Sequence, residues 1–320
     1  MKTVFLARNA MATRFEMVLH GEDELALRAA GEEALDEISA LASQLNFYRM
    51  DSEISRINTE AALGPVPVEP GLFRLLQEAK RVHGLSGGAF DITVAPLMRC
   101  WGFVDGKHHV PSPRELAEAL ECVGMNLVHL DAENFTVQFE RPGVWVDLGA
   151  IGKGFALEIA GEILRETGVT SALIHGGTST VCAIGSPPDE AFWKTAIEHP
   201  GWRQPGEVIL EHERLIAVGK VRDESFSVSA VWGKAFEEGG VSYGHVMDPR
   251  CGQPTQNALL AAVSLPSGTA ADAWSTALLV SGEAGVAALG QVGESARSLL
   301  LMPDNASGFR TINDGFDLLK

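Results

Sequence analysis

Apolar residues recur every three or four positions in several segments of the chain, which is the spacing of one helix face. In the first such segment, Leu35, Ile38 and Leu41 repeat in this way with acidic residues between them. The same criterion predicts helices over 22–46, 72–83, 111–122 and 151–167, and a late one that begins near Ala270. Ser112 or Pro113 would begin the third of these, because both residue types favour helix N-termini.

Other segments alternate apolar and polar residues, as half-buried strands do. The alternation predicts a hairpin within 126–148 and strands over 11–21, 171–177, 180–185, 208–218, 225–232 and 258–265. Residues 47–58 are polar and turn-like, and a proline-rich connector follows at 64–71. Because strands and helices do not alternate strictly, a doubly wound parallel sheet is not favoured. The predicted fold class is α+β, with mainly antiparallel sheets and packed helices.

The length of 320 residues suits two lobes, since domains usually contain about 100–200 residues. Hydrophobic residues make up 46% of the chain and charged residues 21%, which is typical of a globular protein. Against 25 Lys and Arg there are 42 Asp and Glu, a net charge of −17. We therefore expect no nucleic-acid partner, because nucleic acids require a basic face. An anionic cofactor would also be repelled, unless a metal ion or local donors offset the field.

No segment has the composition of a membrane anchor. The apolar run Val4–Ala7 is too short for a signal-peptide core and is interrupted by Arg8. No later run approaches the ~18 residues that are needed to span a bilayer. The four cysteines show no CxxC spacing and are expected to be reduced thiols. We expect a cytoplasmic protein with no membrane span. A chain trimmed of a signal peptide would look the same, which leaves a periplasmic location open.

Asp272 and Thr276 are four positions apart in the late helix, so their oxygens project from one helix face. Carboxylate and hydroxyl oxygens suit a hard cation such as Mg²⁺, which takes its other ligands from water or phosphate. The alternative is structural. An aspartate early in a helix interacts favourably with the helix dipole, and Thr276 would bond back to a carbonyl.

Residues 146–158, VDLGAIGKGFALE, hold three closely spaced glycines between a predicted strand and a predicted helix. Small residues there let backbone N–H groups approach a phosphate, and the helix N-terminus adds positive potential. Lys153 would add a point charge. The spacing is neither GxxxxGK[ST] nor GxGxxG. A tight strand-to-helix turn is the alternative, and the smaller HGGTST loop at 175–180 is open to the same two interpretations.

His245 and Asp248 lie in YGHVMDPRCG, a segment with the tyrosine, proline and glycine of an ordered loop. Histidine is the side chain best suited to proton transfer near neutral pH, and Asp248 is the competing base. The same residues would also suit a turn that begins at Asp248, with His245 as a capping or core residue.

Tyr48 and Asp91 lie in two further loops. Tyr48, in FYRMDSEISRIN, could stack on a ring system. The alternative is a solvated loop that Asp51 or Ser52 caps into a short helix. Asp91, in SGGAFDITVAPL, follows a flexible glycine pair, and a structural turn is the alternative there.

The order of these motifs resembles the ApbE family, the FAD:protein FMN transferases. The resemblance runs from about Met11 to about Gly282 and rests on MATRFEM, FYRMDSEISRIN, GGAFDITVAPLMRCWGF, VDLGAIGKGFALE, IHGGTS, YGHVMDPRCG and ADAWSTALL. It implies one ApbE-like domain over 1–320, with two intertwined α+β lobes divided near 145–150 and the cofactor site between them. It also implies Mg²⁺-dependent transfer of the FMN moiety of FAD to a threonine of an acceptor flavoprotein subunit, with release of AMP.

The resemblance implies roles for individual residues. Mg²⁺ would be held by the backbone carbonyl of Ala150 and the side chains of Asp272 and Thr276. His245 would lie near the reaction centre, with His245 or Asp248 as the base. The residues that would contact FAD are Met11, Tyr48, Ala89, Phe90, Asp91, Asp147, Lys153, Gly176, Gly177 and Val246.

The chain departs from the family pattern at several positions. The segment 155–158 reads Phe-Ala-Leu-Glu where Tyr-Ala-Val-Asp is usual, and 229–232 reads Ser-Ala-Val-Trp where Ser-Gly-x-Tyr is usual. Asn46 and Met50 replace a usual serine and proline. The metal positions are intact. Two other functions share these motifs: a Mg²⁺-dependent FAD pyrophosphatase with water as the nucleophile, and a non-catalytic FAD-binding protein.

Overall fold

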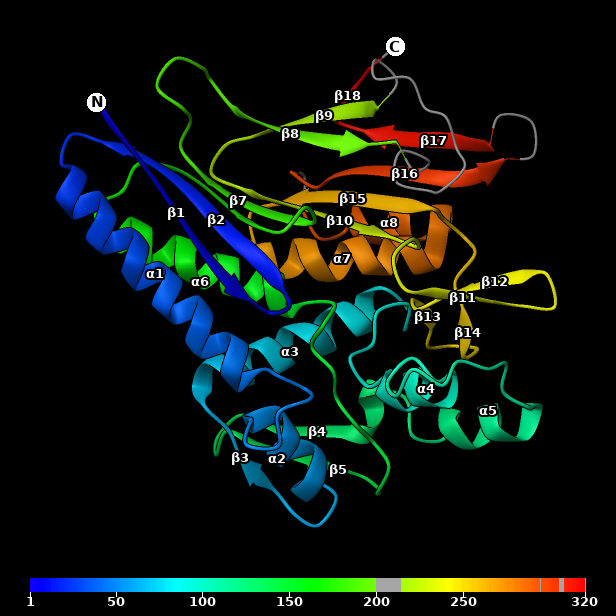
Figure 1. Cartoon of the computed structure of the whole chain (residues 1–320). Coiled ribbons are helices and arrows are strands. Elements are labelled where there is room, and N and C mark those ends of the chain that lie inside the picture. Colours follow the sequence, from blue (N-terminus) through cyan, green and yellow to red (C-terminus); the bar gives the residue numbers. More distant parts are fainter. Residues whose placement is uncertain (200–213, 294, 305–307, 320) are drawn as a thin grey trace.

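An eight-stranded antiparallel sheet forms the centre of the protein (Figure 1). The computed structural model describes residues 1–199, 214–293, 295–304 and 308–319. The strands follow one another across the sheet in the order β1 (Lys2–Ala10), β2 (Thr13–Gly21), β6 (Ser171–Gly176), β7 (Thr180–Ile184), β10 (Ser225–Ala230), β15 (Leu260–Leu265), β16 (Arg297–Asp304) and β17 (Gly308–Asp314). This arrangement confirms the predicted α+β class.

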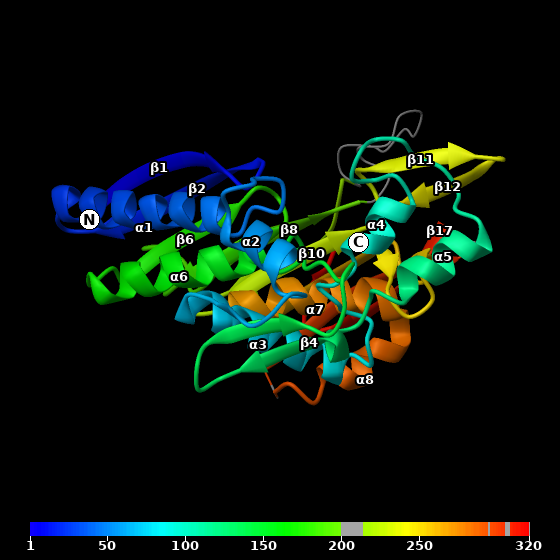
Figure 2. The same ribbon diagram turned by 90° about the horizontal axis from the view of Figure 1, so that it is seen from below.

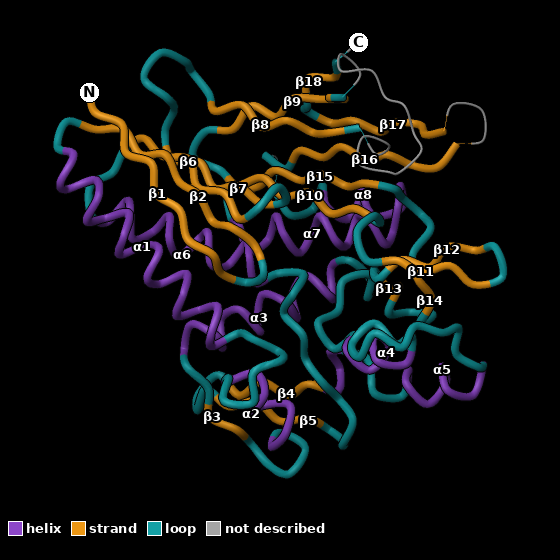
Figure 3. The backbone as a smooth tube through the Cα atoms, in the orientation of Figure 1, coloured by secondary structure: helices purple, strands orange, loops and turns teal. Residues whose placement is uncertain are grey.

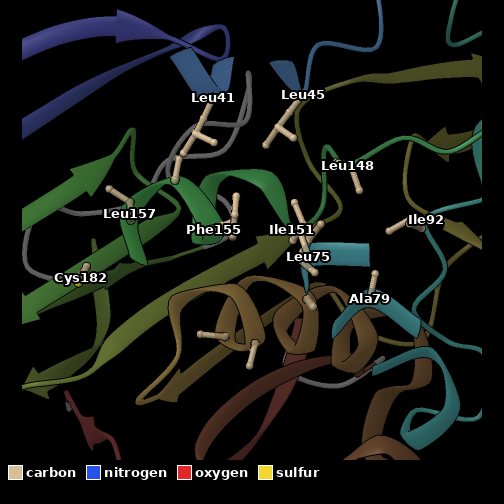
Figure 4. Packing of buried hydrophobic residues seen from close by; sticks show 14 of the residues in the cluster. Leu41, Leu45, Leu75, Ala79, Ile92, Leu148, Ile151, Phe155, Leu157 and Cys182 are labelled. Carbon is tan, nitrogen blue, oxygen red and sulfur yellow. The ribbon is translucent and has the colours of Figure 1, made fainter. Parts of the chain in front are cut away.

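Three helices cover one face of this sheet: α1 (Glu24–Gln44), α6 (Gly152–Glu166) and α7 (Gly268–Ser281). They lie side by side in both views (Figures 1 and 2), and α3 (Pro70–Leu85) packs against α7. Their apolar sides and the facing strand residues form the main core, part of which is drawn in Figure 4. None of the described helices combines the length and the apolar composition that a membrane crossing requires.

A second, smaller core lies under the three-stranded sheet of β8 (Trp193–Glu198), β9 (Leu215–Val221) and β18 (Asp317–Leu318). Trp193, Phe226 and Phe316 are buried in it. The tube in Figure 3 shows this sheet above the large one, on the side away from α6 and α7. The middle strands of the large sheet are therefore covered on both faces, whereas the outer face of β1 is exposed.

The remaining elements are short and lie below and to the right of these helices in the view of Figure 1. They are α2 (Glu53–Glu60), β3 (Val66–Pro67), α4 (Ala95–Cys100), α5 (Pro113–Leu120), a 3₁₀ turn at Met125–Leu127, β4 (Val128–Asp131), β5 (Thr136–Phe139), β11 (Ala235–Glu238), β12 (Val241–Gly244), β13 (Met247–Asp248) and β14 (Gln253–Pro254). A 3₁₀ turn at Gly282–Gly285 and α8 (Val286–Leu289) extend α7.

The predicted helices are confirmed with small shifts at their ends, and Ser112 caps α5 in a capping box. Residues 47–58 were expected to be turn-like, and the alternative of a short helix capped there is confirmed for α2, whose N-cap Ser52 accepts a hydrogen bond from the Ser55 amide through its Oγ. The apolar residues at 144–148 form no strand, so the predicted hairpin is confined to β4 and β5. Of the predicted strand 208–218, residues 208–213 lie outside the described part. The division into lobes near 145–150 stays a prediction.

Helices α6 and α7 approach each other closely at Gly154. An ideal Cβ on Gly154 would lie 2.2 Å from the Gly268 carbonyl oxygen and 2.6 Å from the Asp272 Cβ. One turn further along α6, Glu158 Oε2 accepts hydrogen bonds from Ser267 Oγ (2.8 Å) and from the amide and hydroxyl of Thr269 (2.8 and 2.6 Å). Glu158 thus caps the N-terminus of α7, and the glycine permits the contact.

We predict that Gly154→Ala lowers the free energy of unfolding by about 2–3 kcal/mol, because the added methyl overlaps backbone that cannot move aside cheaply. Urea denaturation measures the change. Gly84→Ala is the matched control, since a Cβ there meets nothing within 4 Å. It should stabilise the protein slightly, by about 0.5–1 kcal/mol. Equal stability of the two variants would contradict the close contact of α6 and α7.

Candidate functional site

Asp272 is a buried carboxylate, only 3% exposed, that three other elements surround with donors. Its Oδ2 accepts the Gly154 amide (2.9 Å) and lies 3.9 Å from Lys153 Nζ. Its Oδ1 accepts Ser227 Oγ (2.9 Å) and Thr180 Oγ1 (3.4 Å). The start of α6 and strands β7 and β10 therefore meet at this carboxylate, which offsets the cost of burying a charge.

The glycine turn before α6 contains backbone groups with no helical partner. Helix α6 begins at Gly152, so the Gly154 amide in its first turn has no partner within the helix and donates to Asp272 Oδ2. Ala150 precedes the helix, and its carbonyl, like that of Gly149, receives no hydrogen bond from the described residues. Leu148 and Ile151, on either side of this turn, are anchored in the main core (Figure 4). The turn is thus held in place with two carbonyl oxygens that no described residue pairs.

Thr276 lies one turn after Asp272 on the same face of α7. It is the one residue from Gly268 to Val280, all of them described, that is not fully buried. Among the described residues no group of three or more His, Cys, Asp or Glu could hold a metal. A cation here would have one carboxylate, one hydroxyl and the unpaired Ala150 carbonyl, all hard oxygens. This donor set fits Mg²⁺, which keeps few protein ligands and completes its shell with water or phosphate.

The two glycines of the β6–β7 turn lie against the tip of the β1–β2 hairpin. Gly177 donates its amide to the Arg14 carbonyl (3.0 Å) and has φ +64°, and a Cβ on it would lie 2.4 Å from Thr13 Oγ1. At the hairpin tip, Met11 and Ala12 have φ of 48° and 57°, an unusual conformation for residues with a Cβ. Gly176 and Gly177 therefore allow a close backbone approach, and the hairpin tip carries strain of the kind found at functional sites.

The proton of the His245 ring has a defined position. Both the backbone amide (3.0 Å) and the ring Nδ1 (3.1 Å) of His245 face the Lys234 carbonyl at the base of the β11–β12 hairpin. Because a carbonyl only accepts, Nδ1 carries the proton and the Nε2 lone pair of the neutral ring is free. Burial lowers the pKa of His245, and the nearby Lys234 charge lowers it further, while the bond to the carbonyl opposes them. The ring is thus kept neutral near pH 7.

Asp147 lies near the same lysine, and Tyr48 lies near Asp147. Burial raises the pKa of Asp147, while the hydrogen bond from the Gly149 amide (2.9 Å) and the Lys234 charge act in the opposite direction. Burial and the Asp147 charge raise the pKa of Tyr48, whose side chain is still 67% exposed. Asp147, Lys234 and His245 form one electrostatic group, with Tyr48 at its edge.

Asp248 is poorly placed to act as a base. Its two oxygens bind the Arg250 guanidinium at 2.8 and 2.7 Å, and Oδ1 also accepts the Arg250 amide (3.0 Å). Val246, between this pair and His245, is half-buried against the main core. Of the two candidate bases, Asp248 is held by a bidentate arginine, whereas the Nε2 of His245 has no hydrogen-bond partner among the described residues.

Ala89, Phe90 and Asp91 are buried, at 1%, 1% and 6% exposure. Asp91 Oδ1 accepts the amide and the hydroxyl of Thr93 (2.7 and 2.6 Å), and Oδ2 lies 3.0 Å from His83 Nδ1. The hydrogen bond to Asp91 raises the pKa of His83. Both carboxylate oxygens are thus used within the protein, which agrees with the structural turn considered for this loop. A contact of these residues with FAD stays a prediction.

A model of the ApbE family matches residues 11–297. The chain belongs to the ApbE family. It is 30% identical over 320 residues to an FAD:protein FMN transferase of Haemophilus influenzae, covering 97% of this chain and 89% of that protein. It is 31% identical over 264 residues to the Vibrio cholerae FAD:protein FMN transferase, covering 82% and 75%.

Two solved structures of ApbE proteins have the same fold. The Thermotoga maritima ApbE protein superposes with a TM-score of 0.82 at 26% identity, over 98% of this chain and 97% of that chain. The Pseudomonas stutzeri flavinyl transferase ApbE in its apo form gives 0.82 at 25% identity, over 98% and 95%. The expected ApbE membership and α+β fold are thereby confirmed.

The departures from the ApbE pattern have structural explanations. Phe155 is buried in the main core at 7% exposure, an environment suited to a ring without a hydroxyl. Glu158 reaches the N-terminus of α7 and caps it. Trp232 is half-buried against the second core. None of the three removes a donor from Asp272 or Thr276.

Sequence reasoning did not single out Thr180, Ser227, Ser229 or Lys234. The serines carried a signal, because 225–229 alternates serine with apolar residues, as a strand with a polar face toward a helix would. Lys234 gave no such signal in the sequence. It acts through its backbone carbonyl and its charge, and the β11–β12 hairpin determines which groups lie near them.

We predict that His245 and His83 titrate on opposite sides of the ordinary histidine pKa of ~6.5. His245 should titrate below it and His83 above it, and the ¹⁵N shifts of His245 should indicate a protonated Nδ1. NMR titration of the ring protons measures both residues in one sample. Lys234→Met should raise the pKa of His245 by removing a like charge and leave that of His83 unchanged. A pKa of His245 at or above that of His83 would contradict this geometry.

Proposed function

We propose that this protein transfers the FMN moiety of FAD to a threonine hydroxyl of an acceptor protein and releases AMP, in a reaction that requires Mg²⁺. Support comes from the relatives named FAD:protein FMN transferases. The observation that carries the proposal is the hydrogen bond from the first turn of α6 to the buried Asp272, together with an Ala150 carbonyl in the preceding turn that no described residue pairs. That arrangement suits a cation together with a phosphate group.

The Ala150 carbonyl, Asp272 and Thr276 would hold the cation. A bound Mg²⁺ supplies a Lewis acid that stabilises negative charge on a phosphoryl oxygen and neutralises the pyrophosphate. This solves the problem set by the net charge of −17, which would otherwise repel FAD.

Lys153 and the first turn of α6 would orient the phosphates. The Lys153 side chain is 24% exposed, and its ammonium lies 3.9 Å from Asp272 Oδ2, so it is held near the cation ligand and is still reachable from outside. The Lys153 amide has no partner among the described residues and adds a donor, and the helix dipole is favourable there. Gly149, Gly152 and Gly154 reduce the bulk of side chains in this turn.

His245 would act as the base. Its free Nε2 would take the proton of the threonine hydroxyl while the oxygen forms a bond to the FMN phosphorus. The bond from that phosphorus to the bridging oxygen breaks, and AMP leaves with its electron pair. Lys234 contributes twice, because its carbonyl orients the ring and its ammonium disfavours a second proton on it.

The test is mass spectrometry of a candidate flavoprotein subunit after incubation with this protein, FAD and Mg²⁺. The expected result is a mass gain on a threonine equal to that of FMN less one water, which is abolished by a chelator and restored by Mg²⁺. Release of FMN and AMP without acceptor, at an unchanged rate when acceptor is added, would instead indicate the pyrophosphatase. Tight FAD binding with no turnover would indicate a non-catalytic protein.

We predict that Asp272→Asn slows FMN transfer by about 10²–10³-fold, because the change removes the one charged ligand of the cation. Single-turnover assays with saturating FAD measure the rate. Asp314→Asn, an exposed position at the far end of β17, is the matched control and should retain the wild-type rate. Thermal unfolding of both variants separates loss of the site from loss of the fold. Wild-type transfer by Asp272→Asn would refute the metal site.

A further inference from the structure

Two serines of β10 face the two proposed cation ligands of α7. Ser227 and Ser229 alternate along the strand and so point to the same side, while Asp272 and Thr276 are one helical turn apart. Ser227 Oγ donates to Asp272 Oδ1 (2.9 Å), and Ser229 Oγ lies 3.2 Å from Thr276 Oγ1. β10 and α7 pack directly against each other, and Figure 1 shows the strand beside the helix. Each of the two proposed ligands is therefore hydrogen-bonded to a different serine of β10.

The Ser229–Ser275 contact (2.7 Å) and the Ser229–Thr276 contact (3.2 Å) each allow either hydroxyl to donate. Ser275 Oγ also lies 2.8 Å from the backbone carbonyl of Asp272, which can only accept. When Ser275 donates its single proton to that carbonyl, it accepts from Ser229, and Ser229 in turn accepts the proton of Thr276.

The result is a chain of hydroxyls with one polarity, from Thr276 to Ser229 to Ser275 to the Asp272 carbonyl. A threonine that binds a cation must present a lone pair to it and place its proton on another acceptor. Without Ser229, the Thr276 hydroxyl would donate its proton to a backbone carbonyl of the preceding turn, as threonines in helices commonly do. That bond would rotate the hydroxyl away from the orientation that Ser229 imposes.

We propose that Ser229 is a positioning residue for the cation site, which accepts the Thr276 proton and thereby turns a Thr276 lone pair toward the cation. This inference rests on the proposed Mg²⁺ site and assigns a role to a residue that makes no contact with the cation.

The test measures cation binding directly, by electron paramagnetic resonance of Mn²⁺ and by calorimetry with Mg²⁺ on the full chain. Ser229→Ala should weaken the binding of both ions by about 10-fold or more, the usual effect of losing a group that orients a metal ligand. Ser298→Ala is the matched control, a buried serine two strands away in the same sheet, and should leave the dissociation constant unchanged. Ser229→Thr retains the hydroxyl and should restore most of the affinity.

A double-mutant cycle distinguishes positioning from a general structural role. If Ser229 acts through Thr276, Ser229→Ala has no further effect on binding in a Thr276→Val background. An equal loss in both backgrounds, or binding by Ser229→Ala within twofold of wild type, would overturn the proposal. Asp272→Asn, measured in parallel, tests the cation site itself. If wild type and Asp272→Asn bind Mn²⁺ equally, the proposed metal site is refuted, whereas a failure confined to Ser229→Ala refutes only the role of Ser229.

Discussion

The hydrogen bond from the Gly154 amide to Asp272 Oδ2 joins the two helices that make the site. It requires α6 and α7 to approach until a Cβ on Gly154 would overlap the Gly268 carbonyl. The same bond pairs an amide of the first helical turn, which has no partner within α6. It also supplies one of the donors that make a carboxylate tolerable at 3% exposure. Burial of the charge, pairing of the amide and position of Lys153 therefore depend on one contact.

The surrounding structure holds this contact rigidly. Glu158 ties α6 to the first turn of α7, and Leu148 and Ile151 fix the glycine turn in the main core. The second sheet covers the outer face of the strands that carry Thr180 and Ser227. A site on rigid elements needs little reorganisation when ligands bind, which favours precise placement of charged groups.

Proton positions in the site are governed by groups that can only accept. The Lys234 carbonyl places the His245 proton on Nδ1, and the Asp272 carbonyl orders the hydroxyls that end at Thr276. In both cases a backbone carbonyl, rather than a side chain, decides which lone pair faces the site. Substitutions at Lys234 therefore leave the tautomer of His245 in place while they change its charge environment.

The sequence by itself determined most helices and the α+β class, because helical spacing and caps such as Ser112 are local properties. It also identified Asp272, Thr276 and His245 as candidates for chemistry, and the family to which they belong. The partners of these residues were decided only by the tertiary structure. Gly154 and Asp272 are 118 positions apart, and Ser229 and Thr276 are 47 apart. Which hydrogen bonds a polar group makes depends on the elements packed against it, and no local pattern records that packing.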